Sequence, residues 1–304
     1  MVSKIIRSAY LGSKEYMEPL KNELNKIIDV RDQLVLSSAP PIKSLWAINT
    51  WLNPKVLTIN SISDGAKQLK SIQRNWCLYS HQLHRRAKLI QEKMPHIAAR
   101  PLRFPCSLPT SPIGSWTLLN ENQILASSKC SSYFKNGEIY FEEDNEGPPS
   151  RAYLKLYESL TRIEKFPQPG DFCIDAGGSP GGWTWVIQKL GAQVLSIDRS
   201  PLDSKIASLP NVEHHKGDVF SIKPSDYGKV DWLFSDVICF PKKLYDWIFP
   251  WIESKKCKNL ICTIKFQGSP DYDFARQFLK IEGSQVIHLY NNRHELTFIH
   301  TNII

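Results

Sequence analysis

The sequence lacks the features that mark several large classes of protein. It has no run of about 18 consecutive apolar residues, so we expect no membrane-spanning helix. Its first residues contain no long apolar stretch of the kind found in secretory signals. The seven cysteines include no Cys-x-x-Cys pair. The closely spaced histidines His81/His84 and His214/His215 have no cysteine partners at ligand spacing. We therefore expect neither a disulfide framework nor a metal site, and a cytoplasmic location with reduced thiols.

Charge is abundant but unevenly distributed. Residues 1–135 carry 19 Lys and Arg against 8 Asp and Glu, a net charge of +11, whereas residues 136–304 carry 19 against 22, a net charge of −3. A basic segment joined to a nearly neutral one is typical of a protein whose first part binds a polyanion. A basic surface that meets only solvent would have the same composition, so charge alone leaves both interpretations open.

Two domains are predicted, with a boundary in the Pro-, Gly- and acid-rich segment FEEDNEGPPS at 141–150. We expect a smaller basic α+β domain over residues 1–140 and a second domain over residues 141–304. Helical and strand patterns alternate in the second domain, which indicates an α/β fold with a parallel sheet covered on both faces. Its helices are expected at 150–160, 181–190, 241–254 and 271–281, and its strands at 172–176, 194–198, 230–236, 259–266, 285–291 and 295–301. In the first domain we expect helices at 15–27, 65–76 and 81–94 and a strand at 55–63.

The segment IDAGGSPGGWTW at 174–185 is the strongest local signal. Its glycines form a turn between a predicted strand and a predicted helix, which is the layout of a nucleotide-type cofactor site. The G-x-G-x-x-G motif and the Walker lysine are both absent, which argues against a plain dinucleotide or phosphate site. A tight turn without a ligand is the structural alternative. The cofactor interpretation assigns contacts to Asp175, Gly177, Gly178, Ser179, Pro180, Gly181, Gly182 and Trp183.

Two acidic residues follow the next two strand-like segments. Asp198 ends the strand at 194–198, where an acid commonly accepts hydrogen bonds from a ribose diol. Asp218, in the segment HKGDV, is predicted to accept from an adenine amino group. Either acid alone would fit an ordinary surface loop. Their joint position beside the glycine turn favours a cofactor site.

The turn and four further segments resemble the FtsJ-like 2'-O-ribose RNA methyltransferases over residues 150–300, about half of the chain. DAGGSPGGW is similar to the S-adenosylmethionine loop of that family. The resemblance implies the family's catalytic tetrad of Lys, Asp, Lys and Glu, in the family's order. Its members are Lys155 in SRAYLKL (150–156), Asp236 in FSDVI (234–238), Lys265 in TIKFQG (263–268) and Glu295 in RHELTFI (293–299).

The same resemblance implies a fold, a cofactor and a substrate. It implies a Rossmann-like class I methyltransferase domain that binds S-adenosyl-L-methionine, with Asp236 also near the cofactor, and RNA as the methyl acceptor. Within the family, the chain resembles bacterial enzymes that methylate a cytidine ribose of large-subunit rRNA. It departs from the family after Asp236, where Val237, Ile238 and Cys239 replace Met-Ala-Pro. We expect this loop to contact the substrate in a different way.

The tetrad residues suit this chemistry independently of the resemblance. A ribose 2'-hydroxyl holds its proton tightly at neutral pH, so an enzyme must align it with the methyl group and help to remove the proton. A lysine can accept a proton if a nearby cation disfavours its charged form. Glu295 begins a predicted strand, so it can join the others only if that strand runs antiparallel. We assign Lys265 as the base, Lys155 as its cationic neighbour, Asp236 as the orienting acid and Glu295 as an anchor for substrate or lysine.

The first domain offers contacts to phosphate rather than chemistry. Its segment from Lys67 to Arg103 is rich in Lys and Arg and contains a single acid, Glu92. Trp76 and Tyr79 lie in this segment and are candidates for stacking on bases, although the helical spacing of Trp76 is more typical of a core residue. The predicted RNA contacts are Lys67, Lys70, Arg74, Arg85, Arg86 and Lys88.

Three functions fit parts of these observations. An S-adenosylmethionine-dependent 2'-O-methyltransferase that acts on RNA, with large-subunit rRNA as substrate, accounts for all of them. A non-catalytic RNA-binding or ribosome-assembly protein with the same fold is the alternative, and the complete tetrad disfavours it. A Rossmann dehydrogenase is disfavoured by the SPGGW turn and by the tetrad.

Overall fold

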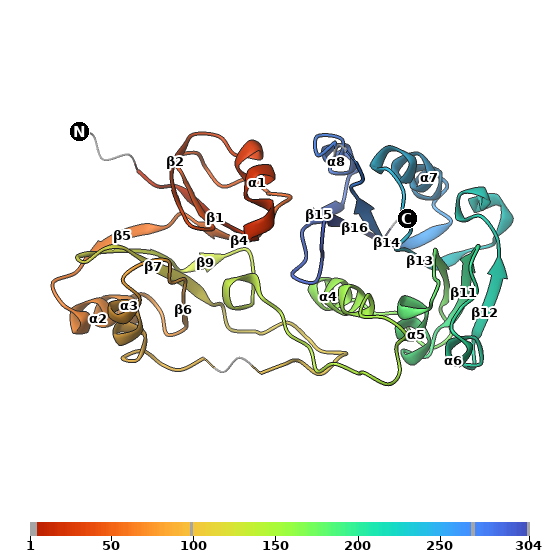
Figure 1. Cartoon of the computed structure of the whole chain (residues 1–304), viewed down its shortest axis with the longest axis horizontal. Helices are drawn as coiled ribbons and strands as arrows, with labels where there is room; N and C mark the ends of the chain where they lie inside the picture. The colour runs from red at the N-terminus through yellow and green to blue at the C-terminus, as the bar shows by residue number, and fades with distance from the viewer. Residues whose placement is uncertain (1–4, 98–99, 269–270, 303–304) are drawn as a thin grey trace. The chain divides into compact units, whose positions relative to one another are not determined.

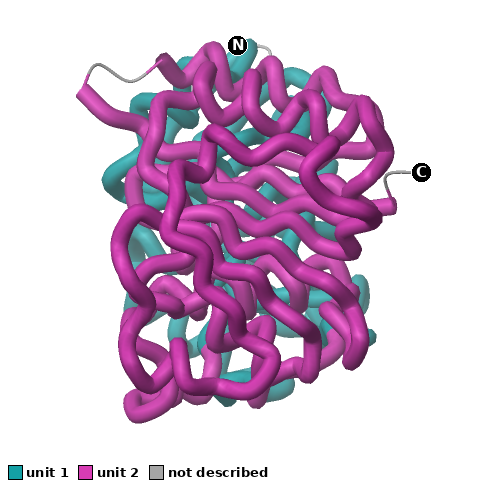
Figure 2. Tube along the Cα trace, turned by 90° about the vertical axis from the view of Figure 1, so that its right-hand side faces the viewer, with its two compact units in different colours: residues 1–102, 108–140 teal, residues 103–107, 141–304 magenta. Residues whose placement is uncertain are grey.

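The computed structural model describes residues 5–97, 100–268 and 271–302. The chain divides into two compact units (Figure 2): unit 1 contains residues 1–102 and 108–140, and unit 2 contains residues 103–107 and 141–304. The segment 103–107 therefore belongs to unit 2, although it falls inside the first predicted domain. Its Phe104 ring stacks on Tyr157 at a centroid distance of 3.7 Å and meets Phe141 and Phe166 edge-on.

Unit 2 is built on a seven-stranded sheet with the order β12-β11-β10-β13-β14-β16-β15. The first five of these strands pair in parallel, and β16 runs antiparallel to both of its neighbours. The central strands are nearly continuous apolar runs because helices cover both of their faces. The strands are β10 (Phe172–Ala176), β11 (Gln193–Asp198), β12 (Val212–Lys216), β13 (Val230–Ser235), β14 (Cys257–Lys265), β15 (Ser284–Ile287) and β16 (Glu295–Thr301).

Helices flank this sheet on both faces, with α5 and α6 on one side and α7 and α8 on the other (Figure 1). The helix expected at 271–281 is limited to the four residues of α8, because Asp271 accepts a hydrogen bond from the Phe274 amide and forms a turn before it. No helix in the described part of the chain is long and apolar enough to cross a membrane. The helices are α4 (Tyr153–Ile163), α5 (Gly182–Lys189), α6 (Ser204–Ala207), α7 (Pro241–Glu253) and α8 (Ala275–Phe278), with short 3-10 turns η3 (Val219–Ser221) and η4 (Pro224–Asp226).

The strand order places a ligand-binding position between β10 and β13. From β10 the chain proceeds outward to β11 and β12, and it then returns to the other side of β10 at β13. Ligands of open α/β sheets bind at the carboxyl ends of the strands where the order reverses in this way. The Ser235 hydroxyl at the end of β13 donates to the Ala176 carbonyl at the end of β10 (2.8 Å), which holds these two strand ends together.

Unit 1 contains two further sheets that the sequence predicts poorly. A five-stranded antiparallel sheet has the order β2-β3-β1-β4-β9, and a four-stranded sheet has the order β5-β8-β7-β6. The strand expected at 55–63 ends at Thr58, and the helix expected at 15–27 ends at Glu23, where strand β2 soon follows. The strands are β1 (Ser8–Gly12), β2 (Ile27–Arg31), β3 (Leu34–Ser37), β4 (Ala47–Leu52), β5 (Lys55–Thr58), β6 (Trp76–Leu78), β7 (Gly114–Asn120), β8 (Gln123–Ser127) and β9 (Lys129–Cys130). The helices are α1 (Met17–Glu23), α2 (Ile62–Ile72) and α3 (His84–Gln91), with 3-10 turns η1 (Lys14–Tyr16) and η2 (Lys135–Gly137).

The two basic helices of unit 1 pack on a common core. Ala66 and Leu69 of α2 and Ala87 of α3 are buried in one cluster with Trp116. Trp76 belongs to the same core, and its indole N–H donates to the Leu69 carbonyl at 2.9 Å. The two helices therefore turn their small and apolar residues inward, which leaves their charged faces toward solvent.

Neither aromatic candidate for base stacking is available for that purpose. The Trp76 side chain is 2% exposed and lies in the core. Tyr79 is 9% exposed, and its hydroxyl accepts from the Gln33 amide and donates to Asp32. The prediction that these rings stack on bases is wrong, because both rings fill the interior of unit 1.

Candidate active site

Four charged side chains from four elements of unit 2 meet beyond the carboxyl ends of β13 and β14. Lys155 projects from α4, Asp236 follows β13, Lys265 ends β14 and Glu295 begins β16. Lys265 and Glu295 are direct partners in the antiparallel pairing of β14 with β16. The strand that Glu295 begins therefore runs antiparallel, as it must for Glu295 to join the other three residues. The Lys155 nitrogen lies 2.8 Å from both oxygens of Asp236 and 3.0 Å from Glu295 Oε1, and the Lys265 nitrogen lies 3.0 Å from Asp236 Oδ1 and 4.0 Å from Glu295 Oε2.

Charge pairing outweighs burial at the centre of this tetrad. Burial acts to lower the pKa of Lys155, but the carboxylates of Asp236 and Glu295 outweigh that effect and hold the pKa above its usual value. Burial acts in the opposite sense on Asp236, and the two lysines outweigh it, so the pKa of Asp236 lies below its usual value. Both groups therefore remain charged at neutral pH, and Lys155 is a fixed cation inside the site.

Lys265 is the more accessible of the two lysines. Its side chain is 18% exposed, against 9% for Lys155. Its nitrogen also donates to the backbone carbonyl of Asp236 at 2.6 Å, which fixes its position. Thr263, two residues earlier on β14, donates to Asp236 Oδ1 at 2.7 Å and was not identified from the sequence. The arrangement leaves Lys265 as the lysine that can reach a substrate.

A second residue missed by the sequence analysis, Glu158, connects two elements of the tetrad. It lies one helical turn after Lys155 on α4 and is completely buried. Its carboxylate accepts from the backbone amides of Tyr290 and Asn291, both at 3.0 Å, and pairs with Arg162 at 2.8 Å. The segment that leads to Glu295 is thus attached to the helix that carries Lys155. A charged residue on the buried face of an amphipathic helix is the sequence signal that could have revealed it.

The glycines of the turn are required by the chain's own packing. An added Cβ at Gly178 would lie 2.3 Å from Ser196 Oγ and 2.9 Å from Asp175 Oδ2, which no real side chain tolerates. Gly177 adopts a left-handed φ of +84°, and a Cβ there would lie 2.9 Å from Val237 Cβ. The glycines alone therefore do not distinguish a cofactor site from a tight turn. The neighbouring polar atoms have to decide between them.

Two buried polar atoms at this turn have unused hydrogen-bonding capacity. Asp175 Oδ2 accepts from Thr184 at 2.6 Å, but Oδ1 is buried with no hydrogen-bond partner among the described residues, and so is the Ser196 hydroxyl. Burial raises the pKa of the Asp175 carboxyl to about 7, although the bond from Thr184 opposes the shift. Unsatisfied buried polar groups are rare in folded proteins and concentrate at functional sites. The turn therefore has the chemistry of a ligand site.

The two acids assigned to the cofactor already hold local structure in place. Asp198 accepts from the backbone amides of Ser179 (3.1 Å) and Ser200 (2.9 Å), so it pins the glycine turn to the end of β11. Asp218 accepts from the Phe220 amide at 3.1 Å and pairs with Arg199 at 2.6 Å. The amide of Phe220, followed by the pairing with Arg199, lowers the pKa of Asp218. A carboxylate has about four lone-pair positions, so each acid can still accept from a ligand.

The other predicted cofactor residues are held in place by contacts within unit 2. Trp183 is 3% exposed, and its indole N–H donates to the Ala152 carbonyl at 2.9 Å, so it joins α5 to the start of α4. Ser179 donates its hydroxyl to the Pro201 carbonyl, and Pro180 follows a cis peptide bond. A Cβ at Gly181 would meet Ile206, and one at Gly182 would meet Ser150.

The predicted RNA contacts of unit 1 are mostly free on the surface. Lys67 and Lys70 on α2, Arg74 after it, and Arg85 and Lys88 on α3 are exposed. Arg86 differs, because it is half-buried and its Nε is shielded from solvent. Lys88 lies 4.0 Å from Glu92, a weak and exposed pair. Five of the six positions can therefore meet a phosphate directly.

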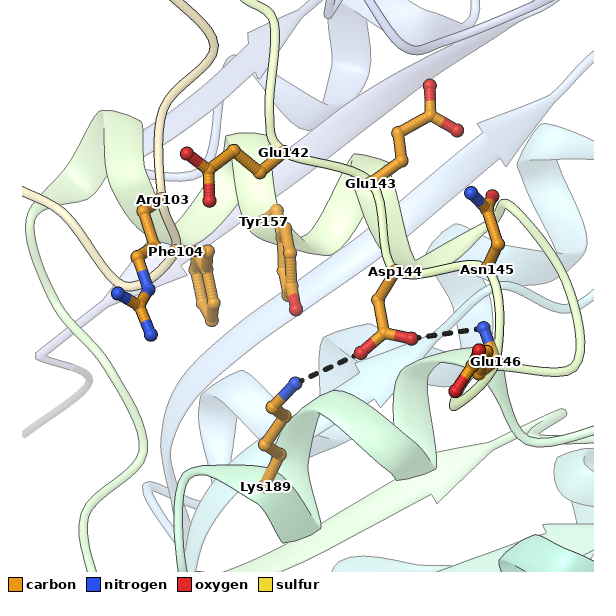
Figure 3. Close-up of a pocket in the computed structure, with 9 residues that line it drawn as sticks. All are labelled: Arg103, Phe104, Glu142, Glu143, Asp144, Asn145, Glu146, Tyr157 and Lys189. Carbon is orange, nitrogen blue, oxygen red and sulfur yellow. Dashed lines mark hydrogen bonds and ion pairs between the residues drawn. The ribbon is translucent and has the colours of Figure 1, made fainter.

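A cavity of about 450 Å³ opens elsewhere in unit 2, beside the Phe104–Tyr157 stack (Figure 3). Its rim is acidic, and Asp144 there is bonded to Lys189 at 3.3 Å. Because none of its lining residues belongs to the tetrad or to the glycine turn, we do not assign the chemistry to it. Within the described residues, no group of His, Cys, Asp and Glu side chains is arranged to hold a metal ion.

Comparison with known proteins finds relatives of unit 2. The family model of FtsJ-like methyltransferases matches residues 148–300, which include the whole tetrad and the glycine turn. A protein named ribosomal RNA large subunit methyltransferase M from Halorhodospira halophila is 34% identical over 157 residues, which cover 49% of this chain and 46% of that protein. A protein of the same name from Xanthomonas oryzae pv. oryzae is 32% identical over 165 residues, which cover 50% and 47%. The chain thus spans just under half the length of these relatives.

Comparison with solved structures finds matches of low similarity. A fibrillarin pre-rRNA processing protein from Methanococcus jannaschii is 16% identical, covers 60% of this chain and 80% of its own, and has a TM-score of 0.38. An rRNA methylase from Streptococcus thermophilus is 10% identical, covers 48% and 95%, and has a TM-score of 0.36.

Loss of the Glu158 carboxylate should disturb the tetrad through the Tyr290–Asn291 segment. In Glu158→Gln, an amide N–H₂ group faces backbone N–H donors, so we expect kcat for methyl transfer to fall at least about tenfold with unchanged affinity for the methyl donor. Arg162→Met is the matched control, because it removes the ion pair but leaves the contacts to the Tyr290 and Asn291 amides. It should lower the melting temperature as much while keeping kcat near wild type. Equal loss of kcat in both variants would mean that Glu158 acts only through stability.

Titration of Asp175 should contribute to the pH dependence of stability. The folded chain retains this proton up to a pH of about 7, whereas the unfolded chain releases it near pH 3.8. Stability from this group is therefore fully present below pH 3.8 and is lost as the pH rises to about 7, with a slope of at most about 1.4 kcal/mol per pH unit. In Asp175→Asn this decline should be absent. Denaturant unfolding of both proteins at several pH values measures the difference, and parallel curves would contradict it.

Proposed function

The chain belongs to the FtsJ-like methyltransferase family, and from this premise we propose that it transfers a methyl group from S-adenosyl-L-methionine to a ribose 2'-hydroxyl of RNA. The observation that carries the proposal is the tetrad, in which a fixed cation and two carboxylates surround the accessible amine of Lys265. Large-subunit rRNA is the proposed substrate, because the relatives named above carry that activity in their names.

The glycine turn supports the cofactor assignment through its donor set. Asp175 Oδ1 and Ser196 Oγ are buried without partners in the described part of the chain, and Asp198 and Asp218 retain accepting capacity at the ends of adjoining segments. These groups would hold the polar parts of S-adenosylmethionine, and Gly177, Gly178, Gly181 and Gly182 would allow its close approach. When bound, the cofactor supplies an electrophilic methyl group, so the protein needs to activate only the acceptor.

The tetrad provides what the acceptor hydroxyl requires. Lys265 is placed to accept the hydroxyl proton, and Asp236 fixes its nitrogen through both a carboxylate oxygen and a backbone carbonyl. Lys155 keeps a positive charge next to the site, which stabilises negative charge that develops on the attacking oxygen. Glu295 balances that cation and holds the second lysine from the other side. Because these groups are preorganised, alignment costs little when the substrate binds.

We further propose that unit 1 carries the RNA to this site. Five of its exposed cations lie on α2, directly after it, or on α3, whereas the unit that contains the tetrad has a slight negative charge. Contacts with phosphate are independent of sequence and supply affinity, and the choice of nucleotide would then depend on groups close to the tetrad.

Removal of the Lys265 nitrogen tests the catalytic assignment. In Lys265→Met the side chain keeps its length, and we expect methyl transfer to fall by about 10²–10⁴-fold, the usual contribution of a general base. Affinity for S-adenosylmethionine, measured by calorimetry, should stay near wild type. Lys258→Met is the matched control, since Lys258 lies on the same strand, is 57% exposed and pairs with Asp231 away from the site. A Lys265→Met enzyme with more than about a tenth of wild-type activity would contradict the assignment.

Salt dependence tests the role of unit 1. In the triple variant Lys67→Gln, Lys70→Gln, Arg85→Gln, the slope of log affinity for RNA against log salt should decrease by about two to three units, because each lost phosphate contact removes about 0.7–0.9. The control variant Lys14→Gln, Lys55→Gln, Lys129→Gln removes the same charge from exposed positions elsewhere in unit 1. Its slope should stay within about one unit of wild type. Equal slopes in the two variants would show a diffuse charge effect rather than contacts on α2 and α3.

A further inference from the structure

Two exposed apolar side chains follow Asp236 of the tetrad closely in the chain. The loop 237–240 joins β13 to α7, and within it Ile238 is 70% exposed and Phe240 is 59% exposed. Cys239 between them is 7% exposed, so the loop alternates outward and inward side chains. We refer to Ile238 and Phe240 as the apolar platform. Large apolar side chains this exposed favour a binding partner, because water is a poor environment for both.

The base of this loop is held firmly. Val237 packs against the glycine turn so closely that a Cβ at Gly177 would lie 2.9 Å from it. Ser235 is bonded to the end of β10, and the Asp236 carboxylate is bound by both lysines of the tetrad. The platform therefore projects from a fixed point between the cofactor turn and the catalytic amines, two and four residues after Asp236.

Positive charge follows the platform immediately. Lys242 is 71% exposed and pairs with Asp246, which is itself 58% exposed on α7. The Lys243 nitrogen lies 3.8 Å from the centre of the Phe220 ring. Burial raises the pKa of the Cys239 thiol to about 11 and the charge of Lys243 opposes this shift, so this cation also lies near the loop. An aromatic surface next to two cations matches a nucleotide, which offers a flat base and a phosphate, better than it matches an apolar protein surface.

We propose that the apolar platform stacks on an unpaired nucleobase of the RNA, at or next to the nucleotide whose ribose reaches the tetrad, with Lys242 and Lys243 near its phosphate. This inference rests on the proposed function. It assigns the choice of nucleotide to the loop 237–240, while the cations of unit 1 supply affinity that is independent of sequence. Stacking requires a base that is out of its helix, so the platform selects unpaired or flipped nucleotides.

The test is steady-state methyl transfer to purified large-subunit rRNA by the full-length chain. We expect kcat/KM for RNA to fall about tenfold or more in Phe240→Ala, in line with the loss of one base–aromatic stack. The KM for S-adenosylmethionine and the melting temperature should not change. Phe240→Trp should retain at least about half of the wild-type kcat/KM, because an indole also stacks. Phe249→Ala is the matched control, since Phe249 is a 39% exposed ring on α7 outside the loop.

The outcomes separate the two proposals. Two results would contradict the stacking proposal and leave the proposed function intact, provided that wild type methylates RNA. The first is a kcat/KM of Phe240→Ala within about twofold of wild type, and the second is a kcat/KM of Phe240→Trp as low as that of Phe240→Ala. A change in melting temperature or sedimentation without a change in kcat/KM would show that another protein surface covers the platform, and it would overturn the proposal as well. If wild type transfers no methyl group to RNA, the proposed function is contradicted, and so is the stacking proposal that rests on it.

Discussion

The ammonium group of Lys155 lies between the carboxylates of Asp236 and Glu295, and the arrangement of unit 2 depends on holding these three groups together. They come from α4, from the loop after β13 and from β16, which are distant in the sequence. A buried cation without its partners would cost several kcal/mol, so each of these elements is fixed by the charge of the others. The antiparallel direction of β16 is part of the same constraint, because only that direction brings Glu295 to the ends of the parallel strands.

The tetrad and the glycine turn differ in whether their buried polar groups have partners. In the tetrad two cations and two carboxylates satisfy one another. Thr263 donates to Asp236, and Glu158 joins α4 to the segment that leads to Glu295. At the turn, Asp175 and Ser196 keep buried oxygen atoms that have no partner among the residues the structure describes. A satisfied network is rigid and can orient an acceptor, whereas unsatisfied atoms are costly until a ligand completes them. This difference is consistent with a resident catalytic group in one place and an exchangeable cofactor in the other.

The sequence predicts unit 2 far better than unit 1, for a physical reason. Strands such as β10 and β14 are buried on both faces, so they are read as apolar runs that end at a turn or at a functional residue. The strands of unit 1 are short and belong to two sheets, and β2 exposes Ile27 and Val30, two of its three apolar residues. The tetrad could be identified because each member lies in a segment that resembles a motif of the family, Lys155 on a helix and the other three at strand ends. The sequence marks Glu158 only as a charge on the buried face of a helix, and its contacts to the amides of Tyr290 and Asn291 appear only in the folded chain.

The central claim is that this arrangement of charges serves a ribose hydroxyl of RNA. The most direct measurement is to incubate the full-length protein with labelled S-adenosylmethionine and large-subunit rRNA, digest the product to nucleosides and identify the labelled species by mass spectrometry. The account predicts label in a single 2'-O-methyl nucleoside, and in the undigested RNA the phosphodiester 3' to that nucleotide should resist alkaline cleavage. Label on a base, or no label with an RNA that the protein demonstrably binds, would contradict it.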